Sequence, residues 1–156
     1  MRLYLVHHAE AVSPDVDPQQ PLSTVGHAQA ARLAARAREA HWAPAAIWHS
    51  GKLRARQTAE ALLRVNPFAE FQMIRGLRPD DPPEIVATAL LGEPRDVMLV
   101  GHLPHLRALA VLFGPAVEPP ALHGAVLWEK GEAGWAIGAR LSADPDRAAP
   151  TRRGEP

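Results

Sequence analysis

Brief apolar runs alternate along this chain with longer segments of helical periodicity, and the two patterns predict different secondary structures. Apolar runs bounded by loop-forming residues are typical of buried β-strands. They cover residues 2–6, 46–48, 71–74, 97–100, 125–129 and 135–139. We expect the run at 71–74 at an edge of the sheet, and Gly131 and Gly134 predict a hairpin between the last two runs.

Segments whose apolar residues recur every three or four positions predict helices. They cover residues 25–42 and 53–65, a segment that opens at Pro82, and residues 106–112. Ser23 or Thr24 can cap the first of these helices, and Pro44 blocks its continuation. Strands that alternate with helices predict an α/β fold, specifically a three-layer α/β/α sandwich with a mostly parallel central sheet.

The chain is long enough for one domain with a single core. It has 156 residues, of which 47% are hydrophobic, and this composition excludes a disordered chain. We expect residues 1–141 to form this domain. From residue 142 the sequence turns to Pro, Asp, Arg and Ala without apolar periodicity, which predicts a flexible C-terminal tail over residues 142–156.

Charge and cysteine content exclude several classes of site and partner. The formal net charge is zero, so no overall field attracts nucleic acid or an anionic membrane, and an anion can bind only where basic groups are placed locally. The sequence has no Cys, which excludes disulfides, Cys-ligated metals and a thiol nucleophile. No apolar run approaches the roughly 20 residues of a membrane span. We therefore expect a cytoplasmic protein without nucleic-acid or membrane partners; its oligomeric state is not predicted, although a monomer is favoured.

Basic and hydroxyl side chains follow three of the predicted strands. His7 and His8 come directly after the first strand, and Ser50 and His102 follow two later ones. The carboxyl ends of parallel strands share one edge of the sheet, where ligands bind. Arg54 stands at the start of the helix that follows Ser50. Imidazole and guanidinium groups gathered at such an edge predict a phosphate-binding site.

Four segments, in this order, resemble the motifs of the histidine phosphatase superfamily. They are Leu3-Tyr4-Leu5-Val6-His7-His8-Ala9-Glu10-Ala11, then Pro21-Leu22-Ser23 with Gly26 and Ala28-Gln29-Ala30, then His49 to Glu60, and then Val100-Gly101-His102-Leu103-Pro104. The most similar subgroup is that of the short SixA-type phosphohistidine phosphatases. The resemblance extends from about Arg2 to Leu141 and implies a phosphoglycerate mutase-like fold.

The resemblance implies a two-step phosphoryl transfer that needs no cofactor. His8 would attack phosphorus and carry a phosphohistidine intermediate that water hydrolyses, and its other ring nitrogen should donate to a backbone carbonyl. His102 would donate a hydrogen bond to the phosphoryl oxygens. Arg54, Ser50 and the backbone amides around Ser50 would hold these oxygens, and His7 would also contact them. The substrate would be a phosphohistidine in a phosphorylated protein or a small phosphoester.

The group that would protonate an alcohol leaving group is left open. Glu10, Asp80 and Asp81 are the acidic candidates, and the sequence does not choose among them. A phosphohistidine leaves as an imidazole and makes a weaker demand for an acid. The chain also lacks the large inserted caps of bigger superfamily members, so we expect an open site that suits a phosphorylated protein surface.

The sequence departs from the family pattern at two positions. The family places Arg directly before the nucleophile, whereas this chain has His7, which offers fewer donors and is about half charged near pH 6.5. Loss of one charged hydrogen bond costs roughly 1.5–3 kcal/mol. We therefore expect a weakened phosphatase that favours mildly acidic pH and gains rate in His7→Arg. Gly51 stands where much of the superfamily has Pro, which we expect to be a mild change because Gly also suits a close approach to phosphate.

Two alternatives stay open at this point. A pseudo-phosphatase that binds a phosphorylated ligand without hydrolysing it is motivated by His7 in place of Arg. A metallohydrolase would use His7, His8, His102 and, with less support, His105 as ligands. Metal sites usually recruit carboxylates or helically spaced ligands, and an Arg in the site would repel a cation, so we expect no metal.

Several other basic residues are interpreted as structural. A lone histidine on or beside an apolar strand usually belongs to the packing, which is our interpretation of His41, His49 and His123. Arg56 has Glu60 four residues further along as its natural partner. We do not expect these side chains to take part in the chemistry.

Overall fold

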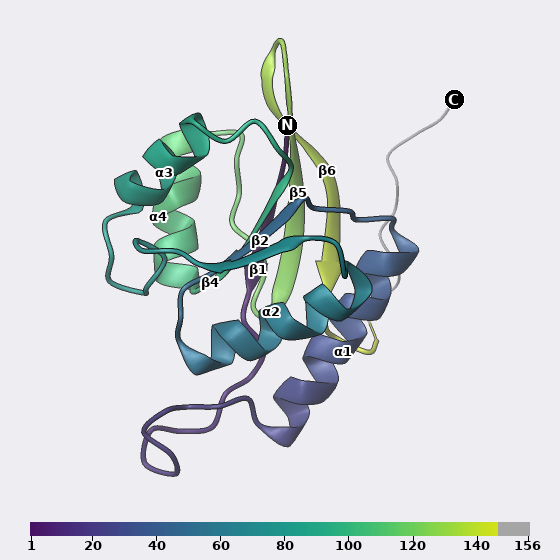
Figure 1. Cartoon of the computed structure of the whole chain (residues 1–156), viewed down its shortest axis with the longest axis vertical. Helices are drawn as coiled ribbons and strands as arrows, with labels where there is room; N and C mark the ends of the chain where they lie inside the picture. The colour runs from purple at the N-terminus through teal and green to yellow at the C-terminus, as the bar shows by residue number, and fades with distance from the viewer. Residues whose placement is uncertain (147–156) are drawn as a thin grey trace.

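The computed structural model describes residues 1–146, and within them the chain forms six strands and four helices (Figure 1). The strands are β1 (Arg2–His7), β2 (Ala46–His49), β3 (Glu70–Met73), β4 (Val97–Gly101), β5 (Gly124–Gly131) and β6 (Gly134–Ser142). The helices are α1 (Thr24–Glu39), α2 (Leu53–Val65), α3 (Pro83–Leu91) and α4 (Leu103–Phe113). All of the elements predicted from the apolar pattern are present.

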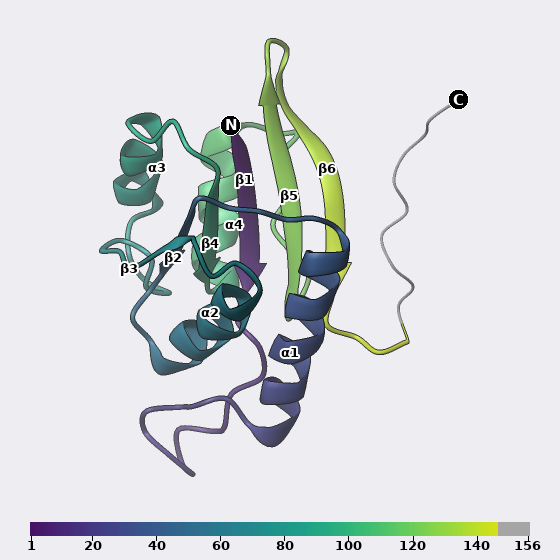
Figure 2. The same cartoon turned by 45° about the vertical axis from the view of Figure 1, so that its right-hand side comes forward.

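The six strands form one sheet in the order β3-β2-β4-β1-β5-β6. The first four are mutually parallel, and β5 and β6 complete the sheet as an antiparallel hairpin. Helices α3 and α4 cover one face of the sheet, and α1 and α2 cover the other (Figures 1 and 2). The predicted α/β/α sandwich with a mostly parallel sheet is therefore confirmed.

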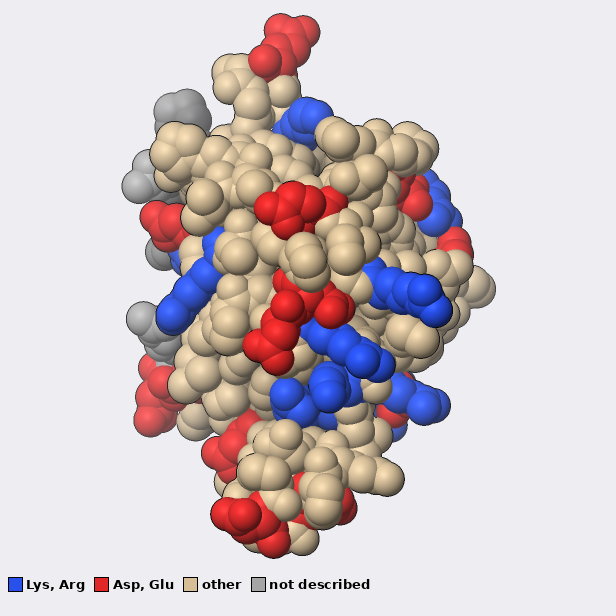
Figure 3. Space-filling model, turned by 90° about the vertical axis from the view of Figure 1, so that its left-hand side faces the viewer, with Lys and Arg blue, Asp and Glu red and all other residues tan. Residues whose placement is uncertain are grey.

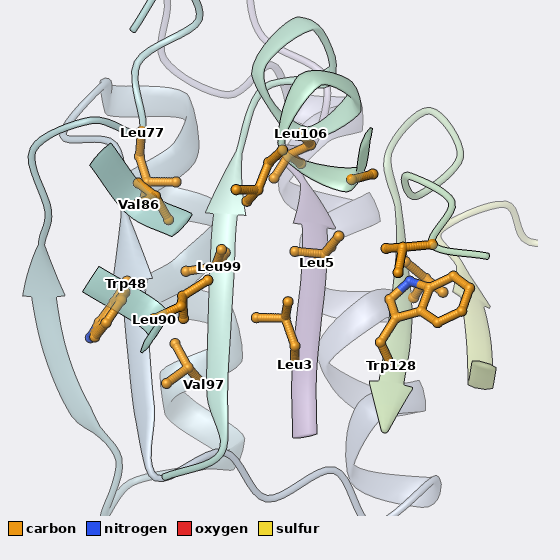
Figure 4. Packing of buried hydrophobic residues seen from close by; sticks show 14 of the residues in the cluster. Leu3, Leu5, Trp48, Leu77, Val86, Leu90, Val97, Leu99, Leu106 and Trp128 are labelled. Atoms are coloured by element: carbon orange, nitrogen blue, oxygen red, sulfur yellow. The ribbon is translucent and has the colours of Figure 1, made fainter. Parts of the chain in front are cut away.

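Each face of the sheet has its own apolar core, because successive side chains of a strand point to opposite faces. Leu3 and Leu5 of β1 pack with Val97 and Leu99 of β4 beneath α3 and α4 (Figure 4). The alternate β1 residues, Tyr4 and Val6, belong to the core beneath α1 and α2. These two buried layers hold the ends of the central strands in fixed positions.

Two helix boundaries differ from the sequence prediction for local reasons. Helix α1 ends at Glu39 instead of near residue 42, and His41 follows with a left-handed φ of 56°. Helix α4 begins at Leu103 instead of residue 106, because Pro104 lies in the first turn, where its missing N–H is not needed. The predicted cap is present, since the Ser23 side chain accepts a hydrogen bond from the Gly26 N–H.

The end of β6 lies within the segment predicted as a flexible tail. Ser142 is the last residue of β6, and Ala143 is buried. Arg36 and Arg32 of α1 donate hydrogen bonds to the carbonyl oxygens of Ser142 and Ala143. The ordered fold therefore continues past residue 141, and residues 147–156 of the predicted tail lie outside the described residues.

The described surface carries charges of both signs. The face that includes α3 and α4 shows basic side chains gathered in its lower half, above a lobe with acidic side chains (Figure 3). Among residues 1–146, no helix combines the length and the apolar character that crossing a membrane requires. The cytoplasmic location expected from the sequence stays a prediction.

Candidate active site

The register of the central strands brings the predicted site residues to one edge of the sheet. His7 of β1 pairs with Gly101 of β4, directly before His102. His49 of β2 pairs with Val100 on the other side of β4, so that Ser50 follows at the same level. The loop after β1 is attached at this point by a 3.1 Å hydrogen bond from the His8 N–H to the Gly101 carbonyl.

His8 is held in one tautomer by its own loop. Its Nδ1 lies 2.7 Å from the carbonyl oxygen of Ala9. A carbonyl only accepts hydrogen bonds, so Nδ1 carries the proton and Nε2 keeps a free lone pair. Burial lowers the pKa of His8 to about 4, and the charge of Arg54 acts in the same direction. The ring is therefore neutral at pH 7, with the contact expected of a nucleophilic histidine.

His102 and Ser50 form a buried pair beside His8. Ser50 Oγ lies 2.8 Å from His102 Nε2, and the ring centroids of His8 and His102 are 5.0 Å apart. Burial lowers the pKa of His102 to about 2, and electrostatic repulsion by the neighbouring basic groups, including Arg54, acts in the same direction. His102 is the N-cap residue of α4; its backbone is extended and its side chain makes no capping hydrogen bond.

His123, which the sequence suggested was structural, lies in the site. Its backbone N–H donates a 2.8 Å hydrogen bond to His7 Nδ1, and its ring Nδ1 donates a 2.7 Å hydrogen bond to the His8 carbonyl. The rings of His7 and His123 stack with centroids 5.1 Å apart. His123 also has a left-handed φ of 52°, which is uncommon outside glycine. His7, His8, His102 and His123 are called the imidazole cluster below.

The expectation of a charged His7 is wrong for the free protein. The side chain is buried, and burial lowers its pKa to about 3, with further lowering by electrostatic repulsion between a protonated His7 and its basic neighbours, among them the permanently charged Arg54 and Arg107. The hydrogen bond from His123 occupies the lone pair of Nδ1, so the proton of the neutral ring lies on Nε2. His7 therefore offers one neutral donor where the family has a charged guanidinium.

Arg54 enters the site from the first turn of α2. Burial lowers its pKa, but a guanidinium stays protonated at any physiological pH. Its Nη1 donates to the Gln20 side chain at 3.4 Å, and Gln20 has a left-handed φ of 48°. Sequence reasoning missed Gln20, which lies in the irregular loop between β1 and α1. Arg56, on the same turn of α2, makes the expected ion pair with Glu60 at 2.8 Å.

Thr58 joins the two sides of the site. Its buried hydroxyl accepts a 3.0 Å hydrogen bond from the Ala9 N–H and donates a 2.8 Å hydrogen bond to the Arg54 carbonyl. The loop that carries His8 is thereby attached to the turn that carries Arg54. On the other side of the loop, a Cβ at Gly26 would lie 1.9 Å from the Glu10 carbonyl oxygen, so only glycine allows α1 to approach so closely.

The segment between β2 and α2 supplies fewer free amides than expected. The Gly51 N–H donates to His49 Nδ1, and the Lys52 N–H donates to Ser50 Oγ. The amides of the first turn of α2, beginning at Leu53, are those that a helix leaves without internal partners. Gly51 has a φ of 82°, which proline cannot adopt, so the exchange of Pro for Gly changes the backbone of this loop as well as a side chain.

The acidic candidates are engaged in local contacts. Glu10 accepts a 2.7 Å hydrogen bond from the Ser23 hydroxyl, and Asp81 accepts one from the Arg78 N–H at 2.9 Å. Asp80 is exposed. Within residues 1–146, no hydrogen bond or ion pair joins a carboxylate to the imidazole cluster or to Arg54.

The histidines that could hold a metal ion differ from those considered in the sequence. Ring nitrogens of His7, His8 and His123 lie within 4.8 Å of one another, and this is the one such group in the described part of the chain. His102 is paired with Ser50 instead. His105 is buried in α4, and neither of its ring nitrogens has a hydrogen-bond partner among the described residues. The group therefore shares His7 and His8 with the set considered for a metallohydrolase, and has His123 in place of His102 and His105.

Comparison with known proteins gives consistent results. The model of the family described as histidine phosphatase superfamily (branch 1) matches residues 3–79. Among solved structures, a SixA protein from Agrobacterium tumefaciens, assigned as a phosphohistidine phosphatase, is 26% identical with a TM-score of 0.73. The match covers 90% of this chain and 97% of that one. No curated protein is significantly similar in sequence.

Two further solved structures share the fold. The protein histidine phosphatase SixA complexed with tungstate has a TM-score of 0.78 at 21% identity, and the match covers 92% of this chain and 97% of that one. A mycobacterial glucosyl-3-phosphoglycerate phosphatase has a TM-score of 0.66 at 18% identity, with 87% and 96% covered. Each of these matches covers at least 87% of this chain, so the similarity in fold is not confined to one part of it.

Proposed function

Because the chain belongs to the histidine phosphatase superfamily, we propose that it is a metal-independent phosphatase that works through a phosphohistidine intermediate on His8. The observation that carries this proposal is the hydrogen bond from His8 Nδ1 to the Ala9 carbonyl. It leaves the Nε2 lone pair free, in a neutral ring, next to the permanent charge of Arg54. A histidine attacks through an unprotonated ring nitrogen, and the neighbouring guanidinium favours binding of the anionic phosphoryl group.

In the first step, the Nε2 lone pair of His8 attacks phosphorus and forms a P–N bond. The bond from phosphorus to the leaving group breaks, and the leaving group takes its electron pair. In the second step, water attacks phosphorus, the P–N bond breaks, and its electron pair returns to Nε2. The released phosphate and solvent take up the protons of the water molecule, so the enzyme ends in its starting state.

Several donors at the site would stabilise charge on the transferred phosphoryl group. Arg54 supplies a planar pair of N–H groups, and the first-turn amides of α2 lie beside it. His7 supplies its Nε2–H, and the pair of His102 and Ser50 supplies a further imidazole or hydroxyl donor. Because His7, Ser50 and His102 are buried, their contribution is larger than in water.

A phosphohistidine in a protein is the substrate class that we favour over an alcohol ester. An alkoxide leaving group needs a proton from a nearby acid, whereas an imidazole makes a weaker demand. Among the described residues, Glu10 and Asp81 accept hydrogen bonds from Ser23 and Arg78, and neither is hydrogen-bonded to the imidazole cluster. Small phosphoesters, especially aryl phosphates with good leaving groups, remain usable substrates in this account.

The test is hydrolysis of a phosphohistidine-bearing protein and of an aryl phosphate, with and without EDTA, by the wild-type protein and His8→Ala. We expect turnover that survives EDTA and is abolished in His8→Ala. Turnover abolished by EDTA would replace the proposal with a metallohydrolase. Phosphate binding without turnover would replace it with a phospho-ligand-binding pseudo-phosphatase.

A further inference from the structure

We propose that the imidazoles of His7, His8 and His123 form a reversible binding site for a divalent transition metal, best suited to Zn²⁺, and that the bound ion inhibits the enzyme. One ring nitrogen from each residue lies within 4.8 Å of the other two. Three imidazoles are a ligand set that Zn²⁺ uses in proteins, with a fourth position left for water. The inhibition rests on the proposed function, whereas the metal binding does not.

Two of the three rings already present a free lone pair. The Nδ1 atoms of His8 and His123 each donate a 2.7 Å hydrogen bond to a backbone carbonyl, that of Ala9 and that of His8 respectively. In the neutral form of each ring, Nε2 is then the unprotonated nitrogen. An imidazole whose Nδ1–H is held by a carbonyl is the usual arrangement of a metal-bound histidine, because this contact fixes the ring and raises its basicity.

His7 is the ligand that must rearrange. Its Nδ1 accepts the N–H of His123, so coordination through Nδ1 displaces that hydrogen bond. Coordination through Nε2 requires the ring proton to move to Nδ1, which the same N–H opposes. His8 and His123 are therefore the principal ligands, and His7 completes the set after this change.

Distance and charge both limit the affinity. Tetrahedral ligands at a Zn–N distance of about 2.1 Å lie about 3.4 Å apart, so small side-chain rotations must bring the three nitrogens closer together. The guanidinium of Arg54, and that of Arg107 on α4, act on this cluster and repel a cation. We expect an affinity below that of a structural zinc site, with the metal removed by EDTA.

The bound ion would compete with the proposed chemistry at one atom. Zn²⁺ bound to His8 Nε2 occupies the lone pair that attacks phosphorus. His102 and Ser50, which pair with each other, take no part in the metal site. The ion therefore acts as an inhibitor, in contrast to the metallohydrolase alternative, in which removal of the metal abolishes activity.

The binding test uses ZnCl₂ alone, titrated by calorimetry into EDTA-treated and dialysed full-length protein. We compare the wild type with His123→Asn and with His27→Ala. Asn tolerates the left-handed backbone of position 123 and its amide can still donate to the His8 carbonyl, so the turn is kept while the imidazole is lost. His27 is an exposed histidine of α1 and serves as the matched control.

We expect one Zn²⁺ per chain in the wild type and in His27→Ala, and at least tenfold weaker binding in His123→Asn, with circular dichroism confirming that each variant is folded. Substitution with Co²⁺ should give the intense visible absorption of a tetrahedral site in the wild type and in His27→Ala, but not in His123→Asn. Absence of saturable Zn²⁺ binding, or equal affinity in His123→Asn, would overturn the proposal.

The inhibition test measures aryl phosphate hydrolysis against Zn²⁺ concentration. Half-inhibition should need at least tenfold more Zn²⁺ in His123→Asn than in the wild type. If Zn²⁺ binds as described but the metal-free protein hydrolyses no substrate, the metal site stands and the proposed function fails. If the metal-free protein is active and Zn²⁺ does not bind, the metal site alone fails.

Discussion

The backbone N–H of His123 donates a hydrogen bond of 2.8 Å to Nδ1 of His7, across 116 positions of sequence. A backbone N–H only donates, so this contact fixes His7 as a neutral ring with its proton on Nε2. The position that the superfamily fills with a charged, bidentate Arg thus carries one neutral donor here. A second hydrogen bond, from His123 Nδ1 to the His8 carbonyl, also joins the segment around His123 to the loop that carries His8.

His7→Arg should therefore raise the phosphatase rate and lower the stability. A charged hydrogen bond to the phosphoryl group stabilises by roughly 1.5–3 kcal/mol, which corresponds to about tenfold to a hundredfold in kcat. The guanidinium cannot accept the His123 N–H, so the free energy of unfolding should fall by about 1 kcal/mol. Kinetics and urea unfolding measure the two effects, with His7→Gln as the neutral comparison. A rate in His7→Arg at or below that of the wild type would show that His7 has another role.

Arg54 and Arg56 lie on the same turn of α2 and should respond differently to substitution. Arg54→Ala removes the charged clamp, and loss of even one charged hydrogen bond lowers kcat/KM by about tenfold to a hundredfold. Arg56→Ala removes an exposed pair with Glu60 that contributes only about 0.3–0.5 kcal/mol to stability, and it should leave kcat/KM unchanged. Steady-state kinetics of both variants tests this contrast. An equal loss of kcat/KM in the two variants would show that Arg54 has no specific role in binding the phosphoryl group.

Thr58 should matter for its hydroxyl rather than for its shape. Thr58→Val keeps the volume but leaves the Ala9 N–H without its partner, which costs about 1–3 kcal/mol in the free energy of unfolding. It should also lower kcat, because the loop that carries His8 loses its attachment to α2. Thr58→Ser keeps the hydroxyl and should stay close to the wild type in both measurements. If Thr58→Val and Thr58→Ser had similar kcat and similar free energies of unfolding, the Thr58 hydroxyl would not be what holds the His8 loop to α2.

Much of this architecture could be predicted from the sequence because its causes are local. The apolar runs of β1 and β4 and the helical periodicity of α1 and α2 depend on neighbouring residues, and parallel strands must end at one edge. That rule places His8, Ser50 and His102 together. The tautomer of His8 is also local, since its partner is the next residue, Ala9.

The parts of the site that could not be predicted depend on long-range contacts and unusual backbone conformations. His123 and Gln20 both have positive φ and reach the site from irregular segments that have no periodic pattern. The neutral state of His7 follows from burial by residues distant in the sequence, so its ordinary pKa was a poor guide. The sequence offered one signal for His123, namely its position directly before β5, the strand that pairs with β1.

The buried histidines should make stability depend on pH. The pKa values of His7, His8 and His102 in the folded protein, about 3, 4 and 2, lie below the usual value near 6.5. Below pH 6.5 the unfolded chain therefore binds protons that the folded chain does not, and the free energy of unfolding falls as the pH decreases towards 4. Each such group contributes up to about 1.4 kcal/mol per pH unit.

Urea unfolding between pH 7.5 and 4.5 measures this dependence. Stability should be flat above pH 7 and decline below it, with a smaller slope in His7→Gln, which lacks one of the three groups. His27→Ala, which removes an exposed histidine, should keep the slope of the wild type. A slope in His7→Gln equal to that of the wild type would contradict a neutral, buried His7.

The most direct test of the central claim is to trap the phosphorylated enzyme. Brief mixing with an aryl phosphate, a denaturing quench at alkaline pH and intact mass spectrometry should show one phosphoryl group added to the chain. Peptide mapping should place it on His8, and the adduct should disappear on brief acid treatment, as expected for a phosphoramidate. Rapid turnover by the wild type with no adduct on His8, or undiminished turnover by His8→Ala, would contradict the account.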